Sequence, residues 1–175
     1  MAEYNINLPL NKEIIENLEM GDRVFLTGYM YTGRDAAHKR LVELMDNKEK
    51  LPISLENETI YYVGPAPAKE GQIIGSAGPT TSYRMDPYTV PLMEKGLKGM
   101  IGKGRRSEEV IESIKKYKGV YFAAVGGAAA YISKCIKKRE LVAYEDLGTE
   151  AILRIYVEKF PVIVAIDSKG NNIYK

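Results

Sequence analysis

Hydrophobic positions in the first half of the chain switch between the two-residue period of strands and the three-to-four-residue period of helices. Tyr4, Ile6 and Leu8 alternate with polar residues as in a half-buried strand, whereas Ala37 and Leu41 share one face of a predicted helix. In chain order, the pattern predicts a strand at 4–8, a helix that begins after Asn11 and ends toward Gly21, a strand at 23–26, a loop at 27–33, a helix that closes at 47–51, and short strands at 60–63 and 72–75.

The second half follows a turn rich in glycine, serine and threonine at residues 76–84, and the pair Asp86-Pro87 after it is typical of a helix start. The remaining pattern predicts a short strand within 99–104, a helix capped by Ser107 that stops near Gly119, a buried strand at 120–125, a helix from about Ala128 to Lys138, strands at 141–144, 151–157 and 162–166, and a turn at 167–170 before a final short strand. We therefore expect an α/β domain with helices packed on one sheet.

The composition is that of a folded globular chain, with 45% hydrophobic and 27% charged residues. Its 175 residues fit a single domain, 1–175. No segment approaches the roughly 20 apolar residues of a membrane helix, and the first residues lack the pattern of a secretion signal, so we expect a cytoplasmic protein. The formal net charge of +2 favours neither a nucleic acid nor an anionic membrane as partner.

The chain has one cysteine, Cys135, and one histidine, His38. A single cysteine cannot form an internal disulfide, and these two side chains cannot complete a zinc or iron–sulfur site. We therefore expect any metal to be held largely by another chain. Cys135, which falls among lysines on a predicted helix, is interpreted as a structural thiol.

The first candidate site is the sequence Gly33-Arg34-Asp35-Ala36-Ala37-His38 at a loop-to-helix junction. Glycine permits a tight turn, and an arginine beside the free N–H groups of a helix N-terminus favours a carboxylate or phosphate ligand. The alternative is that Asp35 only caps the helix while Arg34 and His38 are solvated.

The second candidate site is the turn at residues 75–86. It offers three consecutive hydroxyls, Thr80, Thr81 and Ser82, and the cation of Arg84, which suit an oxyanion or a proton transfer. The alternative is a capped turn with ordinary hydrogen bonds. Thr80 would need strong activation to act as a base, because an isolated hydroxyl is a poor proton acceptor.

The third candidate site is Gly102-Lys103-Gly104, where the glycines allow close approach of a ligand and Lys103 supplies a positive charge. It does not match the Walker A spacing, and we interpret Arg105 and Arg106 after it as solvated. The run of small residues at 126–130 lacks a complete dinucleotide fingerprint and is interpreted as a place of close helix-to-sheet packing.

These three loops, in this order, resemble the β subunit of class I, iron–sulfur-dependent fumarate hydratase, whose family includes the β subunit of L-tartrate dehydratase and the C-terminal domain of single-chain fumarases. The motifs that carry the resemblance span nearly the whole chain: Gly33-Arg34-Asp35-Ala36-Ala37-His38, Gly64-Pro65, Ser76-Ala77-Gly78-Pro79-Thr80-Thr81, Arg84-Met85-Asp86, Gly102-Lys103-Gly104, Gly126-Gly127-Ala128-Ala129 and Phe160-Pro161.

The resemblance implies a swivelling β/α/β domain, with a mixed central sheet and flanking helices, that acts as half of a hydro-lyase. It implies reversible hydration of fumarate to (S)-malate, with a 4Fe–4S cluster held by three cysteines of a partner α subunit. The β chain would close over the other side of the dicarboxylate, and it would be inactive alone; its self-association stays open.

The resemblance also implies roles for single residues. Arg34, Arg84 and Lys103 match substrate-binding positions, and Thr80 matches the threonine proposed as the catalytic base. Asp35, His38 and Thr81 are assigned to support these groups.

Two alternatives to a fumarate hydratase subunit remain at this point. The first is the β subunit of L-tartrate dehydratase, which converts tartrate to oxaloacetate and shares the same loops. The second is a non-catalytic module that binds an anion or a nucleotide, although the chain lacks a complete Walker or Rossmann motif.

Overall fold

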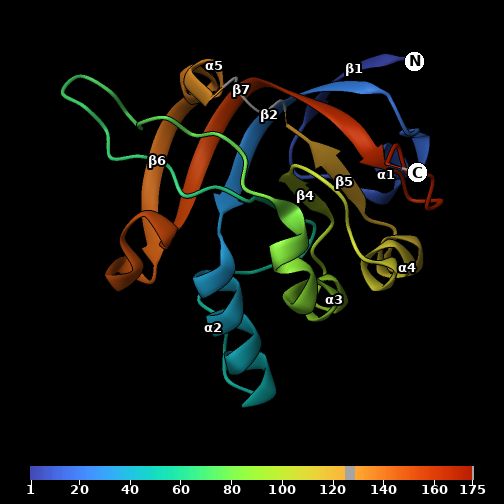
Figure 1. Cartoon of the computed structure of the whole chain (residues 1–175), viewed down its shortest axis with the longest axis horizontal. Coiled ribbons are helices and arrows are strands. Elements are labelled where there is room, and N and C mark those ends of the chain that lie inside the picture. The colour runs from blue at the N-terminus through green and yellow to red at the C-terminus, as the bar shows by residue number, and fades with distance from the viewer. Residues whose placement is uncertain (125–128, 175) are drawn as a thin grey trace.

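The computed structural model describes residues 1–124 and 129–174, and it contains strands and helices in alternation over most of that length (Figure 1). The strands are β1 (Glu3–Asn7), β2 (Arg23–Thr32), β3 (Thr59–Tyr61), β4 (Gly99–Gly102), β5 (Val120–Ala123), β6 (Ile136–Ala143) and β7 (Ile152–Ile166). The α-helices are α1 (Lys12–Asn17), α2 (Asp35–Asp46), α3 (Asp86–Glu94), α4 (Glu108–Tyr117) and α5 (Ala129–Cys135), and 3-10 turns occur at Ser82–Met85 and Glu145–Glu150. Among these residues, no helix is both long and apolar enough to cross a bilayer.

The strands form one mixed sheet whose middle closes on itself. β2, β3, β4 and β5 pair in parallel, and β7 then pairs antiparallel with both β5 and β2, so these five strands form a ring. β1 extends the sheet beside β2, and β6 extends it beside β7. The expected α/β domain with a mixed central sheet and flanking helices is confirmed.

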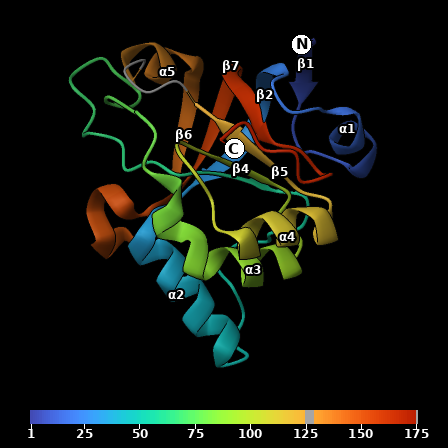
Figure 2. The same ribbon diagram turned by 45° about the vertical axis from the view of Figure 1, so that its right-hand side comes forward.

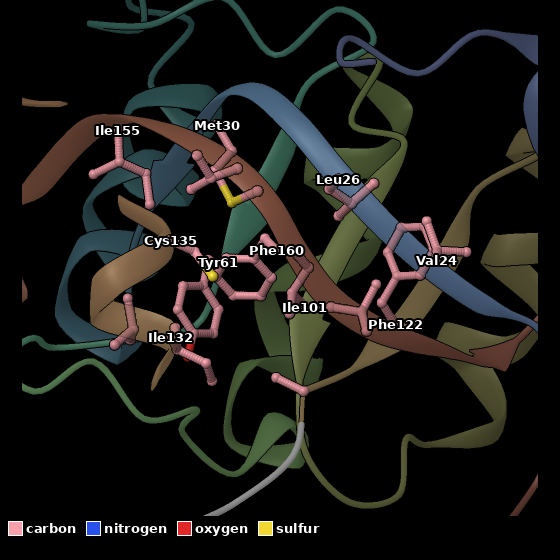
Figure 3. Close-up of a cluster of buried hydrophobic side chains, with 14 of the residues drawn as sticks. Val24, Leu26, Met30, Tyr61, Ile101, Phe122, Ile132, Cys135, Ile155 and Phe160 are labelled. Carbon is pink, nitrogen blue, oxygen red and sulfur yellow. The ribbon is translucent and has the colours of Figure 1, made fainter. Parts of the chain in front are cut away.

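Strand alternation creates two separate cores, because neighbouring residues on a strand point to opposite faces. Tyr61, Ile101 and Phe122 point into the ring, where they meet side chains from β2, β7 and α5 (Figure 3). Their chain neighbours Tyr62, Met100 and Tyr121 point outward into the second core. The residues labelled in the inner core are Val24, Leu26, Met30, Tyr61, Ile101, Phe122, Ile132, Cys135, Ile155 and Phe160.

The outer core lies between the sheet and helices α2, α3 and α4, which cover the same face (Figures 1 and 2). Leu41 of α2, Leu92 of α3 and Ile114 of α4 are each at most 1% exposed there. Local capping fixes where two helices begin: Asn11 accepts a hydrogen bond from the Ile14 amide, and Ser107 accepts one from the Val110 amide. Both predicted caps are confirmed.

The loop predicted at residues 27–33 was wrong, because β2 continues to Thr32. Gly28 has φ +136 and lies at an irregularity in the pairing with β7, so the strand bends there without ending. Pairing with β7 on one side and β3 on the other satisfies the backbone of this glycine- and tyrosine-rich segment.

Five further strand predictions differ from the structure, three of them only in their bounds. Residues 151–157 and 162–166 belong to one strand, β7, which passes through Pro161, and the strand predicted at 141–144 begins five residues earlier as β6. Because β6 starts at Ile136, α5 is shorter than expected and ends at Cys135. Residues 72–75 form no strand and contain a bend at 73–74, and the predicted final strand is a single bridge between Ile166 and Asn172. Val125 and the small residues 126–128 lie outside the described part of the chain.

Candidate functional site

The candidate residues meet at one edge of the sheet because β2, β3, β4 and β5 run in parallel and end on the same side. Arg34 follows β2, Gly64 lies shortly beyond β3, and Lys103 follows β4. In both open and closed α/β sheets, ligands bind at the carboxyl ends of the parallel strands. The long loop after β3 returns to this edge, since the Thr80 amide donates to the Tyr62 carbonyl at 2.7 Å.

One carboxylate at this edge lies between two guanidinium groups. Arg84 donates from Nε to Asp35 Oδ2 at 3.0 Å, and the Arg34 Nε lies 3.9 Å from Asp35 Oδ1. The Arg84 side chain is 45% exposed, so its remaining N–H groups are open to a ligand. The predicted grouping of Arg34 and Arg84 is therefore present, and Asp35 serves as an ion-pair partner instead of a helix cap.

Gly64 gives the Arg34 side chain its space. A Cβ at position 64 would lie 2.9 Å from Arg34 Cδ and 3.1 Å from its Nη1, and 3.3 Å from the Thr149 carbonyl oxygen. Any larger residue would thus push the guanidinium group away from its present place. The carboxylate of Glu150 is also near, since it accepts from the Ala36 amide at 3.5 Å.

His38 is a buried support of the same loop. Its Nδ1 lies 2.7 Å from the Arg34 carbonyl oxygen, and the ring lies edge-on to Tyr62 and tilted to Tyr88, with ring centres 5.3 Å and 6.4 Å apart. Burial lowers the pKa of His38 to about 4, so the ring is neutral at pH 7. Because a carbonyl only accepts, the proton of the neutral ring lies on Nδ1. The alternative of a solvated His38 was wrong.

Thr81 and Lys103 are joined through the backbone. The two residues form a parallel bridge, and the Ser82 amide donates to the Lys103 carbonyl at 2.9 Å. Thr80 and Thr81 are half-buried, whereas the Lys103 side chain is exposed. The loop of these hydroxyl residues therefore pairs through its backbone with the loop of Lys103, and it continues to Arg84, which contacts Asp35.

Arg106 was expected to be solvated, and that expectation was wrong. Its side chain is fully buried, with Nε 2.6 Å from Asp86 Oδ1 and Nη2 donating to Tyr62 and Thr89. Asp86 also accepts from the Ser107 amide at 2.7 Å. Arg106 thus ties the start of α3 to the start of α4 beneath the site. Arg105 is exposed, as expected.

The described residues do not fit a metal cluster of this chain's own. Within 1–124 and 129–174, no three side chains of histidine, cysteine, aspartate or glutamate are grouped to hold a metal ion. Cys135 lies in the inner core beside Phe160, and burial raises the pKa of its thiol (Figure 3). A buried, protonated thiol is a poor iron ligand.

Comparison with models of known protein families shows to which family this chain belongs. The model of the family described as fumarase C-terminus matches residues 1–175. The chain belongs to the fumarase C-terminus family. The resemblance drawn from the three loops is therefore confirmed.

Relatives of this fumarase C-terminus chain are similar over its whole length. It is 43% identical to "Fumarate hydratase class I, aerobic" of Escherichia coli (strain K12), with 99% of the chain aligned to 32% of the relative. It is 39% identical to "Fumarate hydratase 2" of Leishmania major, with 99% aligned to 31%. The chain thus spans about a third of these relatives. It aligns with 91% of the "Putative L(+)-tartrate dehydratase subunit beta" of Methanocaldococcus jannaschii, at 37% identity.

Several residues of this family member matter at the site but were not singled out by the sequence. From the sequence, Tyr62 and Tyr121 were interpreted only as strand residues, and Asp86 was interpreted only as a residue of a helix start. Gly64 entered only as part of a motif, with no reason for the glycine. The only local signal for the buried network was the charged Arg106 next to a strand end.

Proposed function

We propose that the chain is the β subunit of a hydro-lyase that reversibly hydrates fumarate to (S)-malate. The observation that carries this proposal is the pair of arginines held by Asp35 at the carboxyl edge of the parallel strands, the edge to which the paired loops of Thr81 and Lys103 also belong. A dicarboxylate carries two negative charges, and fixed cations are the groups that bind it. Membership of the fumarase C-terminus family and the names of the relatives support the same reaction class.

In this mechanism, Arg34, Arg84 and Lys103 bind the carboxylates and stabilise the negative charge that develops when a proton leaves the carbon next to one of them. Thr80 takes that proton in the dehydration direction and returns it in hydration. A threonine hydroxyl ionises only at high cost, so the neighbouring cations must favour its deprotonated form. Asp35 orients the two arginines, neutral His38 holds the Arg34 carbonyl, and Thr81 supports the loop.

We further propose that a partner α subunit holds the 4Fe–4S cluster and forms the opposite wall of the site. When bound, the cluster supplies a Lewis acid for the hydroxyl group that leaves or enters. This division agrees with the single cysteine of the chain and with the burial of that cysteine in the inner core. The expected cytoplasmic location and a β–β contact stay predictions.

A second candidate function is that of an L-tartrate dehydratase β subunit. One observation favours it: a relative that the chain covers over 91% of its length is named "Putative L(+)-tartrate dehydratase subunit beta". Tartrate differs from malate by one hydroxyl, so the same cations would serve, and discrimination would come from groups that accommodate the additional hydroxyl.

The test is an anaerobic reconstitution with the cluster-loaded α partner. Fumarate formation from malate and loss of L-tartrate are followed separately for the wild type and for Arg84→Ala, Thr80→Ala and Arg139→Ala. Arg139 is an exposed arginine of β6 and serves as the matched control. Malate turnover that needs both chains, falls at least about 100-fold in the two site variants and survives in the control would support the fumarate hydratase proposal. Turnover of tartrate alone would select the second function. Turnover of neither substrate would favour the alternative of a non-catalytic module that binds an anion or a nucleotide.

A further inference from the structure

Two loops of the proposed site lie side by side and pair through their backbones. The loop of Thr80 and Ser82 runs beside the loop of Lys103 and Gly104, with the Ser82 amide bonded to the Lys103 carbonyl. The relative position of the proposed base and the proposed cation is therefore set by whatever fixes these two loops to each other. The backbone pairing of Thr81 with Lys103 joins the main chains of the two loops and involves no side chain.

The Tyr121 hydroxyl joins the same loops a second time. It lies 2.7 Å from Ser82 Oγ and 2.8 Å from the Gly104 carbonyl oxygen. A carbonyl oxygen accepts only, so Tyr121 donates its single proton to Gly104 and must accept from Ser82. The three groups thus form a directed chain from Ser82 through Tyr121 to Gly104.

The middle member of this hydrogen-bonded chain, Tyr121, is firmly held. Tyr121 comes from the central strand β5 and is fully buried, and the charged Arg106 lies 4.8 Å from its ring centre. Burial raises the pKa of the Tyr121 hydroxyl, so it remains a proton donor at neutral pH. Gly102 leaves the space for Ser82, since a Cβ at position 102 would overlap Ser82 Oγ.

We propose that Tyr121 is a positioning residue that fixes Lys103 relative to Thr80 through the hydrogen-bonded chain Ser82–Tyr121–Gly104. This inference rests on the proposed function, because the role that it assigns to Tyr121 is to position two residues of that proposed site. Tyr121 itself does not touch the substrate. Its hydroxyl acts through the two loops, and Ser82 acts through the same chain.

The experiment compares Tyr121→Phe, Ser82→Ala and the double variant in the assembled complex with the α subunit. Tyr121→Phe removes only the hydroxyl and keeps the ring that packs beside Arg106. We expect kcat to fall about 10-fold in each single variant, because small misplacements of reacting groups are costly, with KM changing less than 3-fold. Since both hydroxyls act through one chain, the double variant should lose about 10-fold, and not the roughly 100-fold product.

Amide exchange of the full chain supplies a readout that does not depend on turnover. The Ser82 amide should exchange about 10-fold faster in Tyr121→Phe than in the wild type, because the loop has lost its second attachment. Tyr4→Phe is the matched control: Tyr4 packs at the edge of the inner core, far along the chain from these loops, and should change neither kcat nor this exchange rate.

The outcomes separate this inference from the proposed function. A wild-type complex that turns over neither malate nor tartrate defeats the proposed function, and the inference with it. A wild-type complex that is active while Tyr121→Phe keeps full kcat, or a double variant that shows the multiplied loss, overturns the inference alone. A lower melting temperature with unchanged kcat per assembled complex would assign Tyr121 a purely structural role and would also overturn it.

Discussion

Arg84 donates a hydrogen bond from Nε to Asp35 Oδ2 at 3.0 Å, although the two residues are 49 positions apart in the chain. Asp35 opens α2, whereas Arg84 lies on the 3-10 turn before α3. The same carboxylate lies 3.9 Å from the Arg34 guanidinium group. One negative charge therefore orients two cations, and the proposed dianionic substrate would need such cations.

Replacing Asp35 should weaken substrate binding. In Asp35→Asn the shape is kept but the charge is lost, so the half-exposed Arg84 side chain is no longer held in one rotamer. Ordering a long side chain costs on the order of 1–2 kcal/mol, which corresponds to a rise in KM of about 10-fold. Steady-state kinetics of the assembled enzyme measure this. Asp146→Asn removes the exposed ion pair with Arg40 and is the control that should leave KM unchanged.

Gly64→Ala should act on Arg34 and leave the fold intact. The new Cβ would approach the end of a flexible side chain and one carbonyl, so the arginine would move before the backbone does. We expect kcat/KM to fall about 10-fold or more, with a melting temperature within about 3 °C of the wild type. The control is the same substitution in an Arg34→Ala background, where it should have no further effect. A multiplied loss there would show that Gly64 acts on something other than Arg34.

Local features of this fold could be predicted from the sequence. Asn11 and Ser107 cap helices because the capping side chain and the capped amide are only three residues apart. The alternating β–α pattern and the buried strand at β5 were also correct, because helix periods and the apolar run that begins at Val120 involve residues close together in the chain. The site loops were recognised because their glycines, hydroxyls and cations are short, contiguous motifs.

What the sequence concealed depends on residues that are distant in the chain. Nothing near Arg106 shows that Asp86, twenty positions earlier, would neutralise it in the outer core. Residues 27–32 resemble a loop because of their glycine and polar content, but pairing with β7 makes them a strand. The role of Gly64 likewise depends on the Arg34 side chain, which reaches it from another element.

The stability of the chain should fall between about pH 6.5 and pH 4 because of His38. Its pKa is about 4 in the folded chain and about 6.5 when unfolded, so the unfolded state binds a proton first as the pH falls. The contribution is fully present above pH 6.5 and is lost on acidification, to a total of about 3 kcal/mol at pH 4. Urea unfolding at several pH values measures it.

The comparison variant for this pH effect is His38→Gln, which lacks the titrating ring but keeps a side-chain donor for the Arg34 carbonyl. Carboxylates titrate in the same pH range in both proteins, so the difference between their pH profiles isolates His38, the only histidine of the chain. Parallel profiles would show that the ring is not held neutral by burial.

Arg106→Met should destabilise the chain strongly, although methionine is apolar and similar in length. The substitution leaves Asp86 partly buried without its partner and removes the donors to Tyr62 and Thr89. Breaking a buried ion pair on one side costs about 3–5 kcal/mol, since the remaining charge is left uncompensated. Arg105→Met, one residue earlier and exposed, should change the free energy of unfolding by less than about 0.5 kcal/mol. Equal losses in the two variants would mean that the guanidinium group of Arg106 contributes no more than a surface charge. A large loss in Arg106→Met alone would show that a charge beneath the site, and not only apolar packing, joins α3 to α4.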